Sequence, residues 1–224
     1  ALTVLCLVDL WQVDKRYLND GMFVSKSMRE QPVQKTATDE QILRDKSLDY
    51  RVLNLASNTF NENETSFYHK SVGGYHPAKL RRYQEMIDAH IVPEIKLLGN
   101  ALTTSGGDLT CVKGDSIWPV LNMLNTKYFI VPLGNGQTVP IKNIYAFGNG
   151  WFVDKANEEI ASVGKIDLRH EAVADKKFRE VLGESQTQNN TSIVRITAYQ
   201  PNKLTYEVNS SKGGVVVFSE NYYP

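Results

Sequence analysis

The sequence predicts an α+β fold: a mixed α/β part with short helices, followed by an antiparallel, β-sandwich-like C-terminal part. Between residues 50 and 185, short β-rich runs alternate with short amphipathic helical patterns. From residue 192 onward three β-rich runs recur at roughly ten-residue spacing, which is typical of antiparallel strands. These patterns divide the chain into segments 1–18, 19–185 and 186–224.

The composition excludes several classes of protein. The chain has 224 residues, with 25 basic and 25 acidic side chains. Because these charges cancel, no overall field attracts nucleic acid, and we expect no nucleic-acid partner. The two cysteines, Cys6 and Cys111, form no Cys-x-x-Cys pair. Neither a zinc ribbon nor a disulfide framework is therefore predicted.

The N-terminal segment allows two interpretations. Residues 1–8 form an apolar run that is too short to cross a bilayer, which requires about 20 apolar residues. A buried strand or short core helix is one interpretation. The other is the end of a membrane helix, followed by a juxtamembrane segment up to residue 18. In that case Trp11 and Tyr17 would lie at the membrane interface beside Lys15 and Arg16.

Residues 19–102 contain three predicted elements. A short helix is expected from Thr38, around Ile42, within a polar stretch. Residues 50–56 alternate as a strand does, and residues 58–64 form a polar loop. Pro77 is expected at the first position of a helix that Pro93 ends or kinks. The apolar face of that helix comprises Leu80, Tyr83, Ile87 and Ile91.

The rest of the chain is predicted to form short helices and strands. Residues 103–116 are a glycine-rich loop with a short strand at 109–112, and residues 117–124 have a helical apolar face. Strands are expected at 127–131, 143–147, 151–154, 192–199, 204–209 and 214–218. Short helices are expected at 157–163 and 175–182. The last three strands predict an antiparallel meander.

The end of the sequence suggests a truncated domain. The strand at 215–218 is followed by only six residues. We expect it to be an unpaired edge, which pairs with another chain or is disordered at its end.

The region from residue 66 to 85 is the best candidate for a binding site. Gly73 and Gly74 precede Pro77, and four fixed cations and two histidines occur between His69 and Arg82 with no acidic residue among them. A flexible backbone that leads into a helix N-terminus within a basic cluster binds anionic or sugar-phosphate groups. The candidate substrate-binding residues are Tyr68, His69, Lys70, Gly73, Gly74, Tyr75, His76, Lys79 and Arg82.

Purely structural roles for these residues remain open as well. Arg81 is spaced to pair with Glu85 on a solvated helix face, and Tyr68 and Tyr75 are equally suited to packing. The two histidines are seven residues apart with no third ligand at a suitable spacing, so no metal site is predicted. No Ser/His/Asp arrangement and no nucleotide-binding glycine motif is evident, so no catalytic residue is predicted.

Four motifs carry a resemblance to a known family. They are residues 68–83 (Tyr-His-Lys-Ser-Val-Gly-Gly-Tyr-His and Lys-Leu-Arg-Arg-Tyr), residues 121–128, residues 148–153 and the Tyr-Tyr-Pro end. In this order they resemble the soluble part of YfhO-type bacterial membrane proteins. Such proteins are similar to the GT-C glycosyltransferases, which take a sugar from a polyprenyl-phosphate carrier outside the cytoplasm.

The resemblance implies a location and a role. It implies an extracytoplasmic (periplasmic) domain of a bacterial inner-membrane protein, with the membrane portion of its own parent chain as partner. The catalytic carboxylates of GT-C enzymes belong to loops of the membrane portion. This chain is therefore expected to be non-catalytic alone, to need no cofactor, and to bind a glycan or a polyprenyl-phosphate-sugar. The alternative is a non-catalytic carbohydrate- or protein-binding scaffolding domain of the cell envelope.

Overall fold

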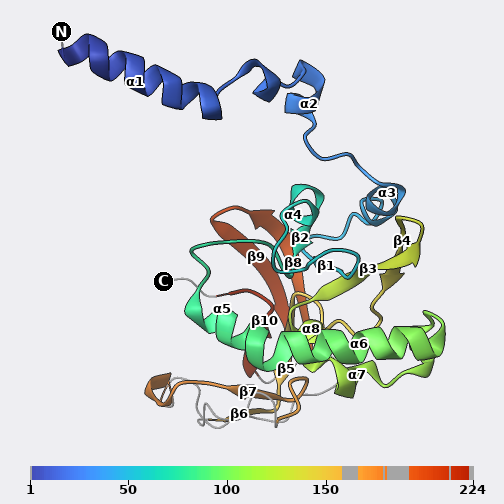
Figure 1. Ribbon diagram of the computed structural model, residues 1–224. Coiled ribbons are helices and arrows are strands. Elements are labelled where there is room, and N and C mark those ends of the chain that lie inside the picture. The colour runs from blue at the N-terminus through green and yellow to red at the C-terminus, as the bar shows by residue number, and fades with distance from the viewer. Residues whose placement is uncertain (1, 158–165, 179, 181–191, 212, 222–224) are drawn as a thin grey trace. The chain divides into compact units, whose positions relative to one another are not determined.

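The computed structural model describes residues 2–157, 166–178, 180, 192–211 and 213–221 (Figure 1). The chain divides into two compact units, Ala1–Lys35 and Thr36–Pro224. The first unit contains helix α1 (Leu2–Tyr17), a 3₁₀ turn η1 (Asp20–Met22) and helix α2 (Lys26–Glu30). The side chains of Asn19 and Ser25 accept hydrogen bonds from backbone N–H groups and so cap η1 and α2.

Helix α1 has no buried residue. The described part of the apolar run at residues 1–8 is helical, so the interpretation of this run as a strand is wrong. At the far end of the helix the Lys15 Nζ lies 5.5 Å from the Trp11 ring centroid. None of the helices in the described ranges combines the length and the apolar character that crossing a membrane requires.

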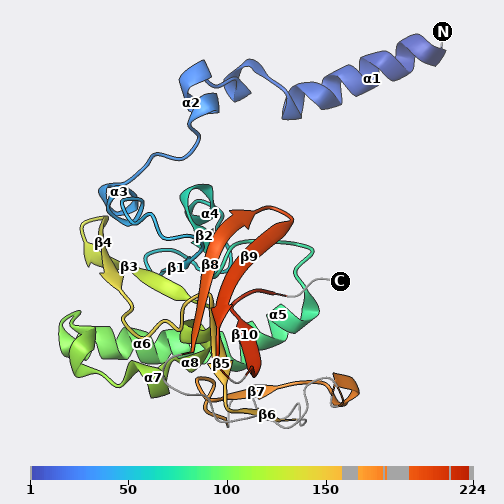
Figure 2. The same ribbon diagram turned by 180° about the vertical axis from the view of Figure 1, so that it is seen from behind.

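A four-stranded sheet forms the centre of the second unit (Figure 2). Its order is β2 (Lys70–Ser71), β1 (Arg51–Asn54), β3 (Thr126–Gly134) and β4 (Gln137–Lys142). Strand β1 is parallel to both of its neighbours, and β4 pairs with β3 as an antiparallel hairpin. The predicted strands at 50–56 and 127–131 are confirmed.

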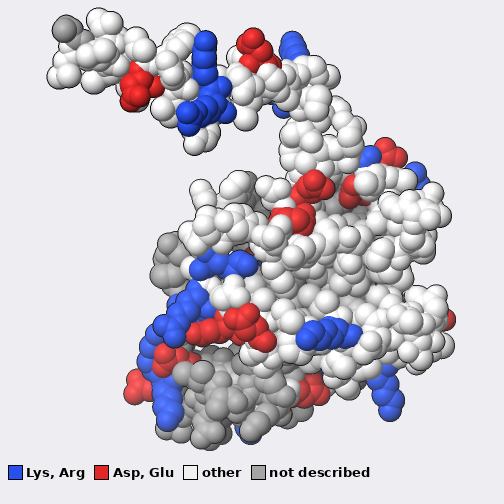
Figure 3. All heavy atoms as spheres, in the orientation of Figure 1, with Lys and Arg blue, Asp and Glu red and all other residues white. Residues whose placement is uncertain are grey.

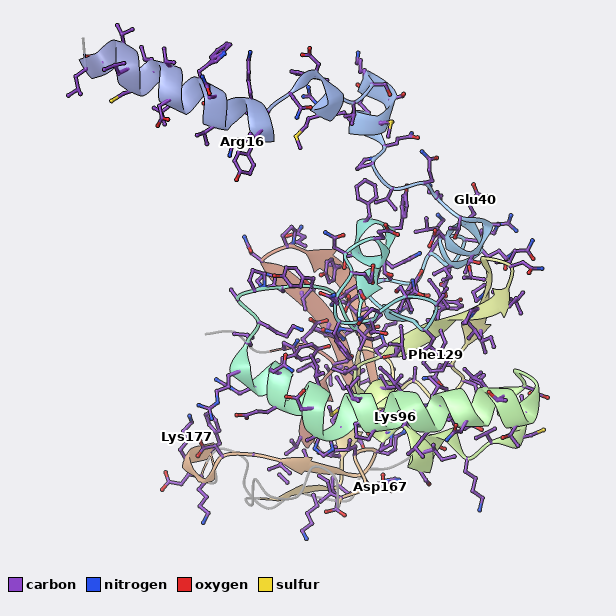
Figure 4. All side chains as sticks on the ribbon, in the orientation of Figure 1. Arg16, Glu40, Lys96, Phe129, Asp167 and Lys177 are labelled. Atoms are coloured by element: carbon purple, nitrogen blue, oxygen red, sulfur yellow. The ribbon has the colours of Figure 1, made fainter. Side chains whose placement is uncertain are left out.

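The two faces of the sheet bury different residues, as the alternation in β1 predicts. Val52 and Ile130 pack with Ile42 of helix α3 (Ala37–Ile42), which begins with a capping box at Thr36. On the other face Leu53 and Phe129 belong to the main core, which lies under the long helix (Figure 4). The sheet is thus covered by helices on both faces.

The long helix consists of α5 (Arg81–Met86), a π-helical turn η2 (Ile87–Ile91) and α6 (Val92–Ser105). The helix continues through Pro93, directly after the π turn. Pro93 lacks an N–H group and crowds the carbonyl one turn earlier, which the wider π turn accommodates. The prediction that Pro77 opens this helix is wrong, because residues 77–78 form a turn and the helix begins at Arg81.

Short helices connect the long helix to the sheet. They are the 3₁₀ turn η3 (Leu109–Cys111), α7 (Gly114–Ile117) and α8 (Pro119–Met123), while α4 (Thr65–Tyr68) precedes β2. The helical apolar face predicted at 117–124 is confirmed, since Val120 and Leu121 are buried. The strand predicted at 109–112 is wrong, because Asp108 accepts a hydrogen bond from the Thr110 N–H and stabilises a 3₁₀ turn instead.

The C-terminal part is built from paired strands, and the predicted α+β class is confirmed. Strands β8 (Ile193–Gln200) and β9 (Lys203–Asn209) form an antiparallel hairpin. Strand β10 (Val215–Phe218) is antiparallel to β5 (Gly150–Val153). The meander prediction is therefore corrected: β10 pairs with a strand about 65 residues earlier in the chain and is no unpaired edge, because a β5 edge is available to it. Figures 1 and 2 show the hairpin and α5–α6 on opposite sides of the unit.

The remaining predicted elements differ from the structure or lie beyond it. Residues 143–149 connect β4 to β5 and form no strand, because the Asn143 side chain turns inward and donates to the Thr126 carbonyl. Asn157 ends β6 (Lys155–Asn157), which is parallel to β7 (Glu171–Val173). The rest of the helix predicted at 157–163 lies outside the described residues. Of the helix predicted at 175–182, the structure describes a 3₁₀ turn η5 (Lys176–Phe178).

Candidate functional site

Two cations of the central sheet meet two carboxyl groups from distant parts of the chain. Arg51 and Lys70 are register partners on the parallel strands β1 and β2, so their side chains lie on the same face. The Lys70 Nζ lies 2.6 Å from the Asp49 Oδ1 and 2.8 Å from the Glu220 Oε1. The Arg51 Nη2 lies 3.6 Å from the Glu220 Oε2. We call Asp49, Arg51, Lys70 and Glu220 the ion cluster.

Arg51 anchors the C-terminal segment to the sheet. The residue is only 5% exposed, and its Nη1 donates to the Leu124 carbonyl at 2.7 Å and to the Ser219 carbonyl at 2.6 Å. The Ser219 hydroxyl in turn donates to the Gly148 carbonyl at 2.7 Å. The segment after β10 is thus fixed at its backbone, which places the Glu220 carboxyl beside Lys70.

The pKa values of the two carboxyl groups of the ion cluster are shifted in opposite directions. Burial alone would raise the pKa of Asp49, but hydrogen bonds from the Glu220 carboxyl and the Lys70 ammonium group outweigh it and lower that pKa. Burial raises the pKa of Glu220, and the hydrogen bond to Asp49 raises it further. Asp49 is therefore the stronger acid of the pair, and Glu220 is the weaker one.

A pocket of about 650 Å³ opens beside Glu220. It is lined by residues of the β8–β9 turn and of the segment after β10: Tyr199, Pro201, Asn202, Lys203, Leu204, Phe218, Glu220 and Asn221. Tyr199 is 47% exposed, and the Lys70 Nζ lies 5.4 Å from its ring centroid. The ion cluster thus orients both an aromatic ring and a carboxyl group at the pocket. We call this site the Tyr199 pocket.

A buried hydroxyl lies close to the same charges. The Tyr206 hydroxyl oxygen is buried and has no hydrogen-bond partner among the described residues. Its ring packs on Phe218 with centroids 4.4 Å apart. Burial, together with the charges of Glu220 and Asp49, raises the pKa of Tyr206 to about 12, so the hydroxyl remains protonated. Within the described residues the Tyr206 hydroxyl is thus a buried donor without an acceptor, and it does not line the Tyr199 pocket.

His69 is placed in the interior rather than at a surface site. Its Nε2 lies 2.8 Å from the Asp39 Oδ1, and both residues are buried. Asp39 also accepts hydrogen bonds from the backbone and hydroxyl of Thr36 through its other oxygen. The pair therefore ties helix α3 to the segment between α4 and β2.

The backbone of the glycine pair is already hydrogen-bonded within the chain. The N–H of Gly73 donates to the Ser71 hydroxyl at 3.0 Å, and the N–H of Gly74 donates to the Thr59 carbonyl at 2.7 Å. A Cβ on Gly73 would lie 1.8 Å from the Thr59 oxygen, so only glycine fits there. These N–H groups face their own loop, and no helix begins at Pro77 to supply the expected anion site.

The other predicted site residues do not join the ion cluster in the structure. Tyr68 is half-buried against Phe67, Tyr75 and Arg82 are exposed, the His76 Nδ1 accepts a hydrogen bond from the Ala78 N–H, and the Lys79 Nζ lies 5.5 Å from the Phe60 ring centroid. Arg81 pairs with Glu85 at 2.8 Å, as one interpretation predicted. Of the nine candidates, Lys70 alone belongs to the ion cluster, where it lies beside Tyr199 without lining the Tyr199 pocket.

Sequence reasoning missed Asp49, Arg51, Tyr199 and Glu220. The available signal was Arg51 directly before the apolar residues Val52 and Leu53 of a strand, since a charged residue in such a position requires a partner. The partner, Glu220, lies 169 residues later and belongs to none of the motifs noted in the sequence.

Comparison with known proteins finds no relative. The chain matched no protein-family model, no curated protein and no solved structure. Among the described residues no group of three or more His, Cys, Asp or Glu side chains is placed to hold a metal ion. Acidic and basic side chains are intermixed on the face shown in Figure 3. Function is therefore inferred from the geometry of the chain itself.

Proposed function

We propose that this chain is the extracytoplasmic part of a polytopic bacterial membrane protein similar to the GT-C glycosyltransferases. In this proposal it binds and positions a glycan or lipid-linked sugar for the membrane portion of its parent chain. The observation that carries the proposal is the Tyr199 pocket, where an exposed aromatic ring, a carboxyl group and side-chain amides converge. Aromatic faces and fixed polar groups together are suited to sugar rings.

The charges of the pocket favour a sugar over a free anion. Lys70 and Arg51 are held by Asp49 and Glu220, so the ion cluster is largely neutralised within the chain. The Glu220 carboxyl lines the pocket and accepts hydrogen bonds, which suits the hydroxyl groups of a sugar. Lys203 lines the same pocket, so it is available to the phosphate that joins a sugar to a lipid carrier.

Helix α1 supports the placement beside a membrane. Leu5 and Leu7 are 67% and 62% exposed, and Trp11, Lys15, Arg16 and Tyr17 follow in the last turns. An exposed apolar helix that ends in aromatic and basic residues is typical of a membrane interface, where rings lie at head-group level.

Saturation-transfer NMR with a farnesyl-phosphoryl hexose tests the binding proposal. We expect the Tyr199→Ala and Glu220→Gln variants to bind at least tenfold more weakly than the unchanged protein. The matched control is Tyr75→Ala, which removes an exposed tyrosine of the loop predicted from sequence. A loss confined to Tyr75→Ala would instead place the site in that loop, and equal binding by all four proteins would refute the proposal.

Vesicle flotation tests the membrane placement separately. We expect the protein to float with vesicles that contain anionic lipid, and the Leu5→Asp, Val8→Asp double variant to remain in solution. Val208→Asp, which changes an exposed apolar residue of β9, should float normally. Absence of flotation by the unchanged protein, combined with sugar binding, would favour the alternative of a carbohydrate-binding module without a membrane role.

A further inference from the structure

A second pocket, of about 380 Å³, lies at the opposite end of β8 from Tyr199. Its size falls within the roughly 300–1,000 Å³ of small-molecule sites. It is lined by residues in and beside β5, in the turn at 166–170 and at the start of β8, among them Phe147, Trp151, Asp154, Arg169, His170 and Ser192. We call it the Arg169 pocket.

The aromatic side of the Arg169 pocket is rigid. The rings of Phe147 and Trp151 meet edge to face with centroids 5.0 Å apart, and both residues are buried. The Trp151 Nε1 donates to the Leu168 carbonyl at 3.0 Å. This hydrogen bond fixes the indole relative to the turn that carries Arg169. The aromatic wall and the polar groups of the pocket are thereby held in a fixed relative position.

The guanidinium group of Arg169 stacks on an aromatic ring, and the backbone N–H of the residue is hydrogen-bonded. The Arg169 Cζ lies 5.0 Å from the Phe147 ring centroid, and its backbone N–H donates to the Asp167 Oδ1 at 3.0 Å. Asp167 is labelled in Figure 4 on the turn below α6. Within the described ranges no carboxylate lies at ion-pair distance from the Arg169 side chain. Stacking on an aromatic ring leaves the N–H groups at the guanidinium edge for a ligand.

Asp154 and His170 supply the remaining polar groups. The His170 Nδ1 lies 2.8 Å from the Asp154 Oδ2, and the Asp154 N–H donates to the His170 carbonyl at 2.7 Å. The contact with Asp154 uses one ring nitrogen and sets the orientation of the imidazole, so Nε2 is the ring atom presented to another molecule. Donors and acceptors are thus in place before a ligand binds.

The mixture of charges selects the class of ligand. Asp154 and Arg169 carry opposite charges, so a phosphate would meet the carboxylate and a cation would meet the guanidinium. A neutral ring with several hydroxyl groups can pair with both, while its apolar face packs on the aromatic wall. We propose that the Arg169 pocket is a second sugar-binding site, specific for a neutral hexose ring.

This proposal rests on the proposed function for the glycan nature of the ligand, and extends it to a longer glycan. Strand β8 has Ile193 at one pocket and Tyr199 at the other. At roughly 3.3 Å per residue these positions are about 20 Å apart. A ligand that occupies both pockets is therefore an oligosaccharide rather than a single sugar.

Saturation-transfer NMR with methyl β-D-glucopyranoside and with cellotetraose tests the second site. We expect Arg169→Gln and Asp154→Asn to weaken binding of the glucoside at least fivefold. Lys176→Gln, an exposed change on the neighbouring turn η5, should leave binding unchanged. Melting temperatures and circular dichroism establish that each variant is folded.

The outcomes separate the two proposals. Glucoside binding that survives Tyr199→Ala but not Arg169→Gln supports the Arg169 pocket, whatever happens to the lipid-linked sugar. Glucoside binding that is unaffected by both Arg169→Gln and Asp154→Asn overturns it. Binding of inorganic phosphate without any sugar binding also overturns the proposal of a second sugar-binding site. If Tyr199→Ala removes every sugar signal, the proposed function stands and the second site is refuted.

Discussion

The carboxylate of Glu94 accepts a hydrogen bond from the backbone N–H of Val120 at 2.9 Å. Its other oxygen accepts from the N–H of Leu121, also at 2.9 Å. A buried side chain of α6 thereby caps the first turn of α8, although Glu94 and Val120 are 26 positions apart. Burial outweighs these two hydrogen bonds and raises the pKa of Glu94 to about 7.

The raised pKa of Glu94 predicts that stability falls as the pH rises. The native state favours the protonated carboxyl. The stabilising contribution of Glu94 is therefore complete below about pH 4.5 and is lost as the pH approaches 7. A shift of this size corresponds to about 3 kcal/mol. We expect the free energy of unfolding of the unchanged protein, measured by urea denaturation, to fall between pH 5 and pH 8. In Glu94→Gln this fall should be smaller by about 3 kcal/mol. Glu40→Gln, an exposed change in α3 (Figure 4), is the control and should retain the full drop. Identical pH profiles for Glu94→Gln and the unchanged protein would contradict the assignment.

Removing the Arg51 guanidinium should destabilise the second unit strongly. Arg51→Met leaves the Leu124 and Ser219 carbonyls without their donor and Glu220 without one cation. We expect a loss of about 3 kcal/mol or more, as for one partner of a buried ion pair. Arg81→Met, which breaks an exposed pair with Glu85, should cost less than about 0.5 kcal/mol. Denaturant titration of both variants measures the difference, and similar losses would show that Arg51 is no anchor.

The buried pair of His69 and Asp39 should be energetically coupled. A double-mutant cycle with His69→Ala and Asp39→Ala subtracts the separate loss of the α3 cap and isolates the contact. We expect a coupling energy of about 1–3 kcal/mol, because the two groups are buried and 2.8 Å apart. The exposed pair of His170 and Asp154 serves as the reference and should give less than about 1 kcal/mol. A coupling near zero for His69 and Asp39 would show that each residue acts alone.

Gly73→Ala should be destabilising, whereas Gly99→Ala should not. A Cβ at residue 73 would lie 1.8 Å from the backbone oxygen of Thr59, so the loop must shift, at a cost of about 1–3 kcal/mol. Gly99 lies within α6, and a Cβ there meets no atom within 4 Å. Alanine at that helical position should stabilise the protein by about 0.5–1 kcal/mol. Thermal denaturation of the two variants gives the sign of each effect, and a rise in melting temperature for Gly73→Ala would contradict the close approach.

Local sequence patterns were sufficient to predict the elements in which apolar or charged side chains recur at a regular spacing. The alternation of Val52 and Leu53 predicted a strand, and the structure places these residues in separate clusters on the two faces of the sheet. The spacing of Arg81 and Glu85 predicted their ion pair. The C-terminal strands followed from their β-rich composition. Where competing local bonds were strong, as at Asp108 and at the 77–78 turn, the same reasoning placed an element wrongly.

The sequence by itself therefore determined the α+β class and most strands, because propensity and periodicity depend on residues a few positions apart. Only the tertiary structure decided that β10 pairs with β5 and that Arg51 and Lys70 meet Asp49 and Glu220. Strand pairing depends on which strand edge is still unpaired. A buried cation can pair with any carboxylate that the fold brings near. Neither condition depends on the spacing of residues along the chain. The Tyr199 pocket could therefore be identified only from the tertiary structure, which brings its segments together.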